Sequence, residues 1–345
     1  MSHVITGAGI GTQRYFYIAV TLILFFTPSL YAGSVDYDFY KGKTINYIVA
    51  TKPGGGYDSY ARLIARHMAK YIPGATIIVK NIPGAGHIIG ANETYLAKPN
   101  GLTIGTFSTG LIYSQIIGQP GIKFDLAKYS WIGKANSEHR VIIVGKNTPF
   151  KTLKDLMESK EPIKMACGGV GSGDYNETLI LAQALDANLK VIPGYNGNEG
   201  DMAIMRGEVA GMTGTYTGLR GLIKAGEARV LLQIAHKKHA ELPDVPLASD
   251  IKVSEKGKRL MSLVAGIAEI YRLTAAPPNI SPGKLEVLRA AYKNTLRDPQ
   301  LLSDAQKIGL EINPSFGDET AKLVKDAINQ PAENLALLKK IIKVE

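Results

Sequence analysis

A repeated pattern of strand, glycine-rich or polar turn, and helix dominates the first third of this chain. Apolar segments of strand length lie at 44–50, 75–80 and 102–107, and a turn sequence follows each of them. The helical pattern after the first turn, over 59–72, puts its large apolar side chains on one face: Tyr60, Leu63, Ile64, Met68 and Tyr71. Strands that alternate with helices predict a parallel sheet whose two faces are covered by helices.

The same alternation returns in the middle of the chain. The expected strands there are 141–144, 163–166, 190–193, 209–213 and 230–234, and the expected helices are 152–159, 175–185 and 200–206. The segment 282–344 is mostly helical in pattern, with breaks expected at Pro299, Pro314 and Pro331. A chain of 345 residues exceeds the usual size of one hydrophobic core, so the sequence predicts two α/β domains.

Glycine clusters stand where strands end and helices begin, at Pro53–Gly56, Gly84–Gly90 and Gly168–Gly173. In open parallel sheets, ligands bind beyond the carboxyl ends of the strands, where loops meet helix N-termini. Free backbone N–H groups and the positive end of the helix dipole attract a carboxylate or a phosphate there. Glycine lets the backbone approach such an anion closely. The loops therefore predict reversible anion binding that needs no charged side chain.

Each of these loops also has a simpler interpretation. Pro53–Gly56 fits an ordinary tight turn, and Asp58 fits an N-cap or an ion-pair partner of Arg62 four residues later. Gly84–Gly90 has the spacing G-x-G-x-x-x-G, one residue longer than the dinucleotide fingerprint, and no acid ends the next strand. A nucleotide-dependent enzyme using the Gly84 loop remains the alternative, and a thermal shift with NAD or ATP would support it.

Other motifs for catalysis or metal binding are missing from the sequence. Neither a G-x-S-x-G nucleophile elbow nor an H-E-x-x-H zinc motif occurs, and no lysine with serine or threonine follows Gly168–Gly173 as in a phosphate loop. Cys167 is the one cysteine, which excludes an internal disulfide and a cysteine-based zinc cluster and fits a small buried residue at a strand end. We expect no enzyme activity, no cofactor and no metal.

The net charge of +10 comes from 40 basic and 30 acidic residues that are interspersed along the chain. Dispersed charge is typical of a solvated surface, and no nucleic-acid motif accompanies it, so no nucleic-acid partner is expected.

The N-terminal segment predicts export. Residues 15–27 are almost wholly apolar, Arg14 precedes them, Pro28 follows, and small Ala32 and Gly33 come next. This order is typical of a secretory signal peptide over residues 1–32, cleaved near Ala32. The alternative is an uncleaved anchor, although the apolar run is shorter than the ~20 residues that span a bilayer. We expect the mature chain to be soluble and exported.

An ordered set of motifs resembles the receptors of tripartite tricarboxylate transporters, the TctC or Bug type of extracytoplasmic solute receptor. Each motif taken alone has low specificity, but together they cover essentially the whole mature chain. In chain order they are Gly42–Ile45, Pro53–Asp58 with Ala61-Arg62, Val79–Gly86, Pro99–Gly101, Gly169–Gly173, Lys224–Gly226 with Arg229, and Leu242–Pro246.

The resemblance implies a type II periplasmic binding protein, an α/β fold with two Rossmann-like lobes and a central ligand cleft. Lobe 1 would comprise 33–144 and 256–345, and lobe 2 the inserted segment 145–255, with hinge strands near Val144 and Val264. It implies capture of a di- or tricarboxylate or a related organic acid in the periplasm, and delivery to a permease with a large and a small subunit. The receptor is expected to be a monomer. A receptor that reports ligand occupancy to a signalling partner is the remaining alternative.

Site residues follow from the resemblance by position. The lobe 1 residues are Gly55, Gly56, Asp58, Ala85, Gly86, His87, Ser108 and Thr109. The lobe 2 residues are Gly171, Ser172, Gly173, Tyr195 and Asn196, with Thr215 and Tyr216 as weaker candidates. His87 stands where the family usually has a second glycine, so it is either a ligand contact or an exposed residue that opens a helix. The turn at Pro193–Gly197 lacks the family's lysine, which leaves the ligand's identity open.

Overall fold

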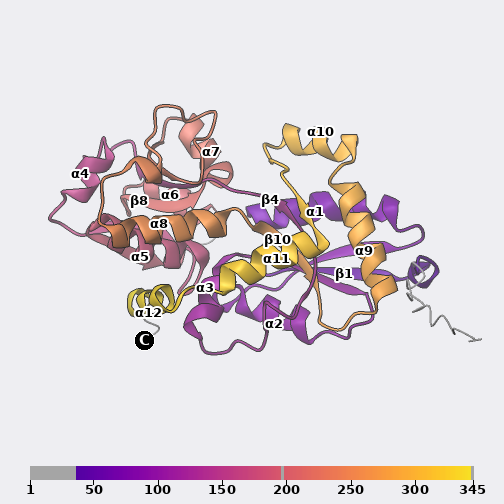
Figure 1. The fold of residues 1–345 in the computed structure, drawn as a ribbon. Helices are drawn as coiled ribbons and strands as arrows, with labels where there is room; N and C mark the ends of the chain where they lie inside the picture. The colour runs from indigo at the N-terminus through magenta and orange to yellow at the C-terminus, as the bar shows by residue number, and fades with distance from the viewer. Residues whose placement is uncertain (1–35, 196–197, 343–345) are drawn as a thin grey trace, which may run out of the picture. The chain divides into compact units, whose positions relative to one another are not determined.

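The computed structural model describes residues 36–195 and 198–342, and these form two β-sheets with their own helices (Figure 1). The first sheet has the strand order β11-β4-β10-β3-β1-β2, and the second has the order β7-β6-β8-β5-β9. The predicted signal peptide and Asn196 lie outside the described residues.

The first three strands are parallel, as the sequence pattern predicted. β1 (Thr44–Val49) lies between β2 (Thr76–Asn81) and β3 (Thr103–Phe107). A helix follows each strand: α1 (Gly56–Met68), α2 (Ile88–Leu96) and α3 (Gly110–Ile117). Their N-termini therefore lie at the carboxyl ends of the strands, where anions were expected to bind.

Three further strands, joined by antiparallel pairings, complete the first sheet, and the sequence pattern did not reveal them. They are β4 (Ser130–Asn136), β10 (Tyr271–Ala276) and β11 (Ser315–Phe316). β10 pairs with β3 on one side and β4 on the other, so a late segment of the chain lies in the middle of this sheet.

The second sheet agrees closely with the strands expected in the middle of the chain. Its members are β5 (Arg140–Gly145), β6 (Ile163–Cys167), β7 (Leu189–Pro193), β8 (Gly211–Thr215) and β9 (Ala228–Ile234). β6 runs parallel to β7 and β8, whereas β5 is antiparallel to β8 and β9. The accompanying helices are α4 (Leu153–Met157), α5 (Gly173–Leu185), α6 (Glu199–Met205), α7 (Tyr216–Lys224) and α8 (Glu255–Ala268).

The C-terminal part is helical and returns to the first sheet, as expected. It contains α9 (Pro282–Thr295), α10 (Pro299–Lys307), α11 (Gly317–Ile328) and α12 (Ala332–Ile341). α9 and α11 pack on β4, and α9 and α10 also pack on α1. Pro299 is the first residue of α10 and Pro331 precedes α12, positions where a missing N–H costs no helical hydrogen bond.

The passage between the two sheets differs from the expected one. The chain leaves the first sheet after Asn136 and enters the second at Arg140, so β5 lies in the second sheet although the expected boundary followed Val144. The return falls at 269–270, between α8 and β10. Val264 was expected near a hinge strand. It lies instead in α8, which packs on α5, because an amphipathic helix covers this face of the second sheet.

Alternating side chains of β5 belong to two separate hydrophobic clusters. In β5, Ile142 and Val144 point into one cluster, and Val141 and Ile143 point into another on the opposite face. The cluster around Ile142 also contains Phe107 and Trp131 of the first sheet. Apolar packing is thus continuous between the two sheets. Cys167 is buried and free at the end of β6, as predicted.

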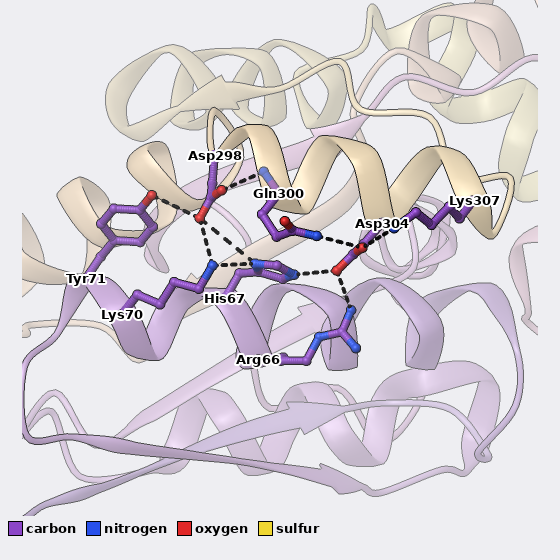
Figure 2. A network of polar contacts seen from close by, with 8 residues as sticks. All are labelled: Arg66, His67, Lys70, Tyr71, Asp298, Gln300, Asp304 and Lys307. Carbon is purple, nitrogen blue, oxygen red and sulfur yellow. Dashed lines mark hydrogen bonds and ion pairs between the residues drawn. The ribbon is translucent and has the colours of Figure 1, made fainter.

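A polar network fastens α10 to the C-terminal end of α1 (Figure 2). Asp298 accepts hydrogen bonds from Lys70 at 3.2 Å and Tyr71 at 3.1 Å. Asp304 contacts Arg66 at 3.1 Å and His67 at 3.2 Å. Burial raises the pKa of Asp298, but hydrogen bonds from Gln300 and Lys70 lower it by more, to about 2. The network therefore holds α1, the helix that carries the first glycine loop, on the C-terminal helices.

None of the helices within 36–195 and 198–342 has the length and hydrophobicity needed to span a bilayer.

Candidate functional site

Glycine loops of the two sheets contact one another at the carboxyl ends of their strands. A Cβ atom on Gly86, after β2, would lie 2.9 Å from the carbonyl carbon of Gly171, after β6. A Cβ atom on Gly110, the first residue of α3, would lie 2.7 Å from the backbone nitrogen of Gly173, the first residue of α5. Both distances are shorter than a real Cβ contact, so these approaches require glycine. The predicted anion-binding loop Gly84–Gly90 and the turn after β3 therefore both face the predicted loop Gly168–Gly173.

The loop after β2 reaches this contact through an unusual backbone. Four consecutive residues have positive φ: Gly84 at 132°, Ala85 at 45°, Gly86 at 59° and His87 at 81°. Left-handed conformations are costly for residues with a side chain and persist where the surroundings enforce them. This stretch turns the chain so that Gly86 meets Gly171 and α2 begins at Ile88.

Side-chain bonds organise the N-terminus of α5. Ser172 is the N-cap, and its hydroxyl accepts a hydrogen bond from the Tyr175 N–H and donates one to the Gly169 carbonyl at 2.7 Å. Asp174 accepts from the Gly168 N–H at 2.8 Å. Ser172 and Gly173 are thereby held at the positive end of a helix that points toward Gly110.

The first glycine loop is organised by Asp58, which pairs with Arg62 at 2.9 Å as the four-residue spacing predicted. Asp58 is not the N-cap of α1, because the helix begins at Gly56 and the capping position falls on Gly55. The buried carboxylate instead accepts from the Gly54 N–H at 3.0 Å and from Asn81 at 2.9 Å. These bonds fix the loop, and the role of Asp58 as a ligand contact stays a prediction.

Of the remaining predicted residues, Ser108 and Thr109 lie at the contact between the loops, whereas Thr215, Tyr216 and Tyr195 have other neighbours. Ser108 and Thr109 are buried between β3 and α3, and the Ser108 hydroxyl accepts from the Gly110 N–H at 3.1 Å, so both lie at the loop contact. Thr215 caps α7, but the Tyr216 hydroxyl bonds to Glu241 at 2.9 Å and its ring packs on His239. Tyr195 lies beside the end of β6, where its N–H donates to the Cys167 carbonyl at 3.1 Å.

Several polar atoms near these loops are buried without a hydrogen-bond partner among the described residues. They are Tyr57 Oη, His87 Nδ1, Thr109 Oγ1, Tyr113 Oη, Asn176 Oδ1 and Arg272 Nε. Buried polar atoms in native proteins are nearly always paired, so a cluster of exceptions marks a place where another molecule can bind. Most of these residues were not predicted as site residues. The only sequence signal for Arg272 was a charge between apolar neighbours in a segment without a clear strand pattern.

Two buried ion pairs flank the same region. Arg272 contacts Glu138 at 3.3 Å, and Arg140 donates from Nε to Glu177 at 2.6 Å. Burial raises the pKa of Glu138, and the neighbouring Arg272 opposes this rise. Burial likewise raises the pKa of Glu177 to about 7 against the opposing effect of Arg140. The site thus holds charges of both signs in a desolvated setting, where electrostatic contacts are strong.

His87 makes the stability of the fold depend on pH. Burial lowers its pKa to about 4, although the nearby Asp174 opposes this shift. The unfolded chain, with a pKa near 6.5, then binds more protons than the folded chain between these values, so stability falls as the pH drops from about 6.5 toward 4. We expect His87→Asn, which tolerates positive φ, to reduce by about 2 kcal/mol the stability lost between pH 7 and pH 4.5. Urea unfolding at both pH values measures this, and equal losses in the two proteins would contradict it.

In the part of the chain that the structure describes, no group of three or more histidine, cysteine or acidic residues is arranged to hold a metal ion.

The architecture has close counterparts among solved structures. The periplasmic binding protein BugD superposes with a TM-score of 0.73 at 23% identity, covering 89% of this chain and 99% of that one. MatC of Rhodopseudomonas palustris, solved with bound malate, gives a TM-score of 0.69 at 20% identity, covering 87% and 99%. A UPF0065 protein encoded in the tcbD–tcbE intergenic region of a Pseudomonas species is 25% identical over 328 residues, 92% of each chain.

Two β-sheets with flanking helices, whose glycine loops meet at the carboxyl ends of the strands, define the fold of a periplasmic solute-binding protein. The model of the tripartite tricarboxylate transporter family receptor, TctC, matches residues 60–341. The chain belongs to this family, which is a family of receptors and not of enzymes.

Proposed function

We propose that this protein is an extracytoplasmic receptor that captures a small organic acid through its carboxylate and delivers it to a membrane permease. The supporting observation is the meeting of α3 and α5 at Gly110 and Gly173, beside buried polar atoms without partners. The positive dipole ends of α3 and α5 converge there, and α5 adds the backbone N–H groups of its first residues, whereas the Gly110 N–H of α3 is bonded to the Ser108 hydroxyl. A carboxylate removed from water would form charge-assisted hydrogen bonds with these groups.

Family membership supports the wider role. A tripartite tricarboxylate-type permease with a large and a small subunit is the partner that this family implies. The apolar segment that follows Arg14 supports export to the periplasm. We propose that the receptor is a monomer. The malate bound to MatC supports a carboxylic acid as the ligand class. By sequence position, the residues we propose as ligand contacts are Gly55, Gly56, Ala85, Gly86, His87, Ser108, Thr109, Gly171, Ser172 and Gly173, and the further candidates are Asp58, Tyr195, Asn196, Thr215 and Tyr216.

Isothermal titration calorimetry tests the proposal with malate, succinate, adipate, citrate, aspartate and benzoate, and with glucose, NAD and ATP as controls. We expect at least one organic acid to bind and the controls not to bind. Binding of neutral solutes alone, or of none of the acids, would refute carboxylate capture. Binding of NAD or ATP alone would favour a nucleotide site at the Gly84 loop instead.

A further inference from the structure

Arg272 stands in β10 with a backbone conformation that arginine rarely adopts. Its φ is 58°, in the left-handed region, within a strand whose burial is complete over Tyr271–Ala276. Such a conformation is unfavourable for a long side chain and is retained where the surroundings fix it. The surroundings here direct the side chain inward, since only 4% of the residue is exposed.

The guanidinium lies at the N-terminus of α1, inside a cage of tyrosine rings. Its central carbon is 4.2 Å from the ring centre of Tyr57 and 4.9 Å from those of Tyr60 and Tyr271. A Cβ atom on Gly56 would lie 2.6 Å from Nη2, so glycine at this position makes room for the arginine. A cation therefore packs against the positive end of a helix, an arrangement that an anion bound beside both would stabilise.

The charge of Arg272 is only partly satisfied by the protein. Glu138 accepts from Nη2 at 3.3 Å, but the same carboxylate also accepts from Thr217 at 2.9 and 2.7 Å. A guanidinium has five N–H donors, and Nε is buried with no partner in the described part of the chain. The hydroxyl of Tyr57, whose ring lies under the guanidinium, is buried and unpartnered in the same way. Both groups can donate to one further oxygen-bearing anion.

We infer that Arg272 is a specificity-determining residue that binds one carboxylate of a dicarboxylate ligand, together with the Tyr57 hydroxyl and the N-terminus of α1. The other carboxylate lies at the facing N-termini of α3 and α5. This rests on the proposed function and narrows it from organic acids to dicarboxylates. A monocarboxylate leaves the donors of Arg272 and Tyr57 unpaired, as they are without ligand, so it gains none of the stabilisation that a second carboxylate obtains from them.

Matched acid pairs test the inference by calorimetry: succinate with butyrate, and adipate with hexanoate. We expect the wild-type protein to prefer the dicarboxylate of at least one pair by about 100-fold or more, since removing a partner of buried polar groups is costly. Arg272→Gly suits the positive φ but leaves Glu138 buried without its partner, so thermal unfolding first checks that the variant is folded at the titration temperature. We expect it to bind the dicarboxylate about 100-fold more weakly and the monocarboxylate within threefold of wild type. Arg272→Lys should recover only part of the loss, because lysine keeps the charge and not the planar fork.

Further variants separate recognition from structure. Tyr57→Phe removes one donor and should reduce dicarboxylate affinity about 10-fold without changing monocarboxylate affinity. Arg66 lies on the same helix with its side chain 64% exposed, so Arg66→Met should change neither the dicarboxylate affinity nor the monocarboxylate affinity. An Arg272→Gly protein that keeps its dicarboxylate preference, or that loses both ligand types equally, would overturn the inference while carboxylate capture still stands. A wild-type protein that binds no acid would refute both.

Discussion

Replacing Gly110 with valine is expected to weaken binding of the preferred carboxylate by ~100-fold or more. A Cβ atom at this position would lie 2.7 Å from the nitrogen and 3.0 Å from the Cα of Gly173, which are backbone atoms that cannot rotate away. The N-termini of α3 and α5 would then have to separate. Hydrogen bonds to a charged group contribute about 1.5–3 kcal/mol each, so losing two of them accounts for a factor of at least ~100 in affinity.

Calorimetry with the dicarboxylate that binds the wild-type protein most tightly measures this loss. Gly221→Val is the matched control, because Gly221 also lies in a helix, α7, and a Cβ atom there meets no atom within 4 Å. Both variants should keep the wild-type circular dichroism spectrum, since valine is tolerated in a helix at a cost below about 1 kcal/mol. An affinity of Gly110→Val within threefold of wild type would mean that the two loops need not meet for binding.

Removing one partner of the Arg140–Glu177 pair is expected to lower the free energy of unfolding by about 3–5 kcal/mol. Both side chains are almost fully buried, with exposed fractions of 3% and 1%. Arg140 also donates to the Tyr271 hydroxyl at 3.4 Å, so the pair joins β5 and α5 to β10. In Glu177→Gln the guanidinium keeps its charge in a desolvated site without a counter-ion. In Arg140→Met the Glu177 carboxyl loses the group that lowers its pKa and is protonated at neutral pH at the cost of its ionic contact.

Urea unfolding of the two single variants and of the double variant Arg140→Met/Glu177→Leu separates the charge effect from packing. The double variant should regain at least half of the loss, because apolar side chains of similar volume replace a buried ion pair at little cost. Glu158→Gln serves as the control, since its pair with Lys154 is exposed and should contribute less than about 0.5 kcal/mol. A change below about 0.5 kcal/mol in Glu177→Gln would show that the pair does not stabilise the fold.

Local sequence patterns predicted those features of the structure that depend on residues close together in the chain. The alternation of apolar strands, turns and helices over 44–107 predicted the parallel strands β1, β2 and β3, because each unit is continuous in the chain. The spacing of Asp58 and Arg62 predicted their ion pair, because residues four apart are neighbours on a helix. Motif order then predicted the receptor family, which the match over 60–341 confirms.

Features that depend on distant segments were not predicted. β10 pairs with β3 although more than 160 residues separate Phe107 from Leu273, and its sequence carries a charged residue where a buried strand would be apolar. The positive φ of Arg272, its cage of tyrosines and its contact with Gly56 all follow from that pairing. The same reason explains why the expected passage between the sheets at Val144 and Val264 was displaced to 137–139 and 269–270.

The chain by itself determined which loops are rich in glycine and which helices begin after them, since backbone freedom and apolar periodicity are properties of short segments. Only the tertiary structure decided that Gly86 and Gly110 meet Gly171 and Gly173, and that Arg272 stands over the start of α1. Contacts of this kind arise from packing between segments far apart in sequence, and that packing leaves no periodic mark on either segment.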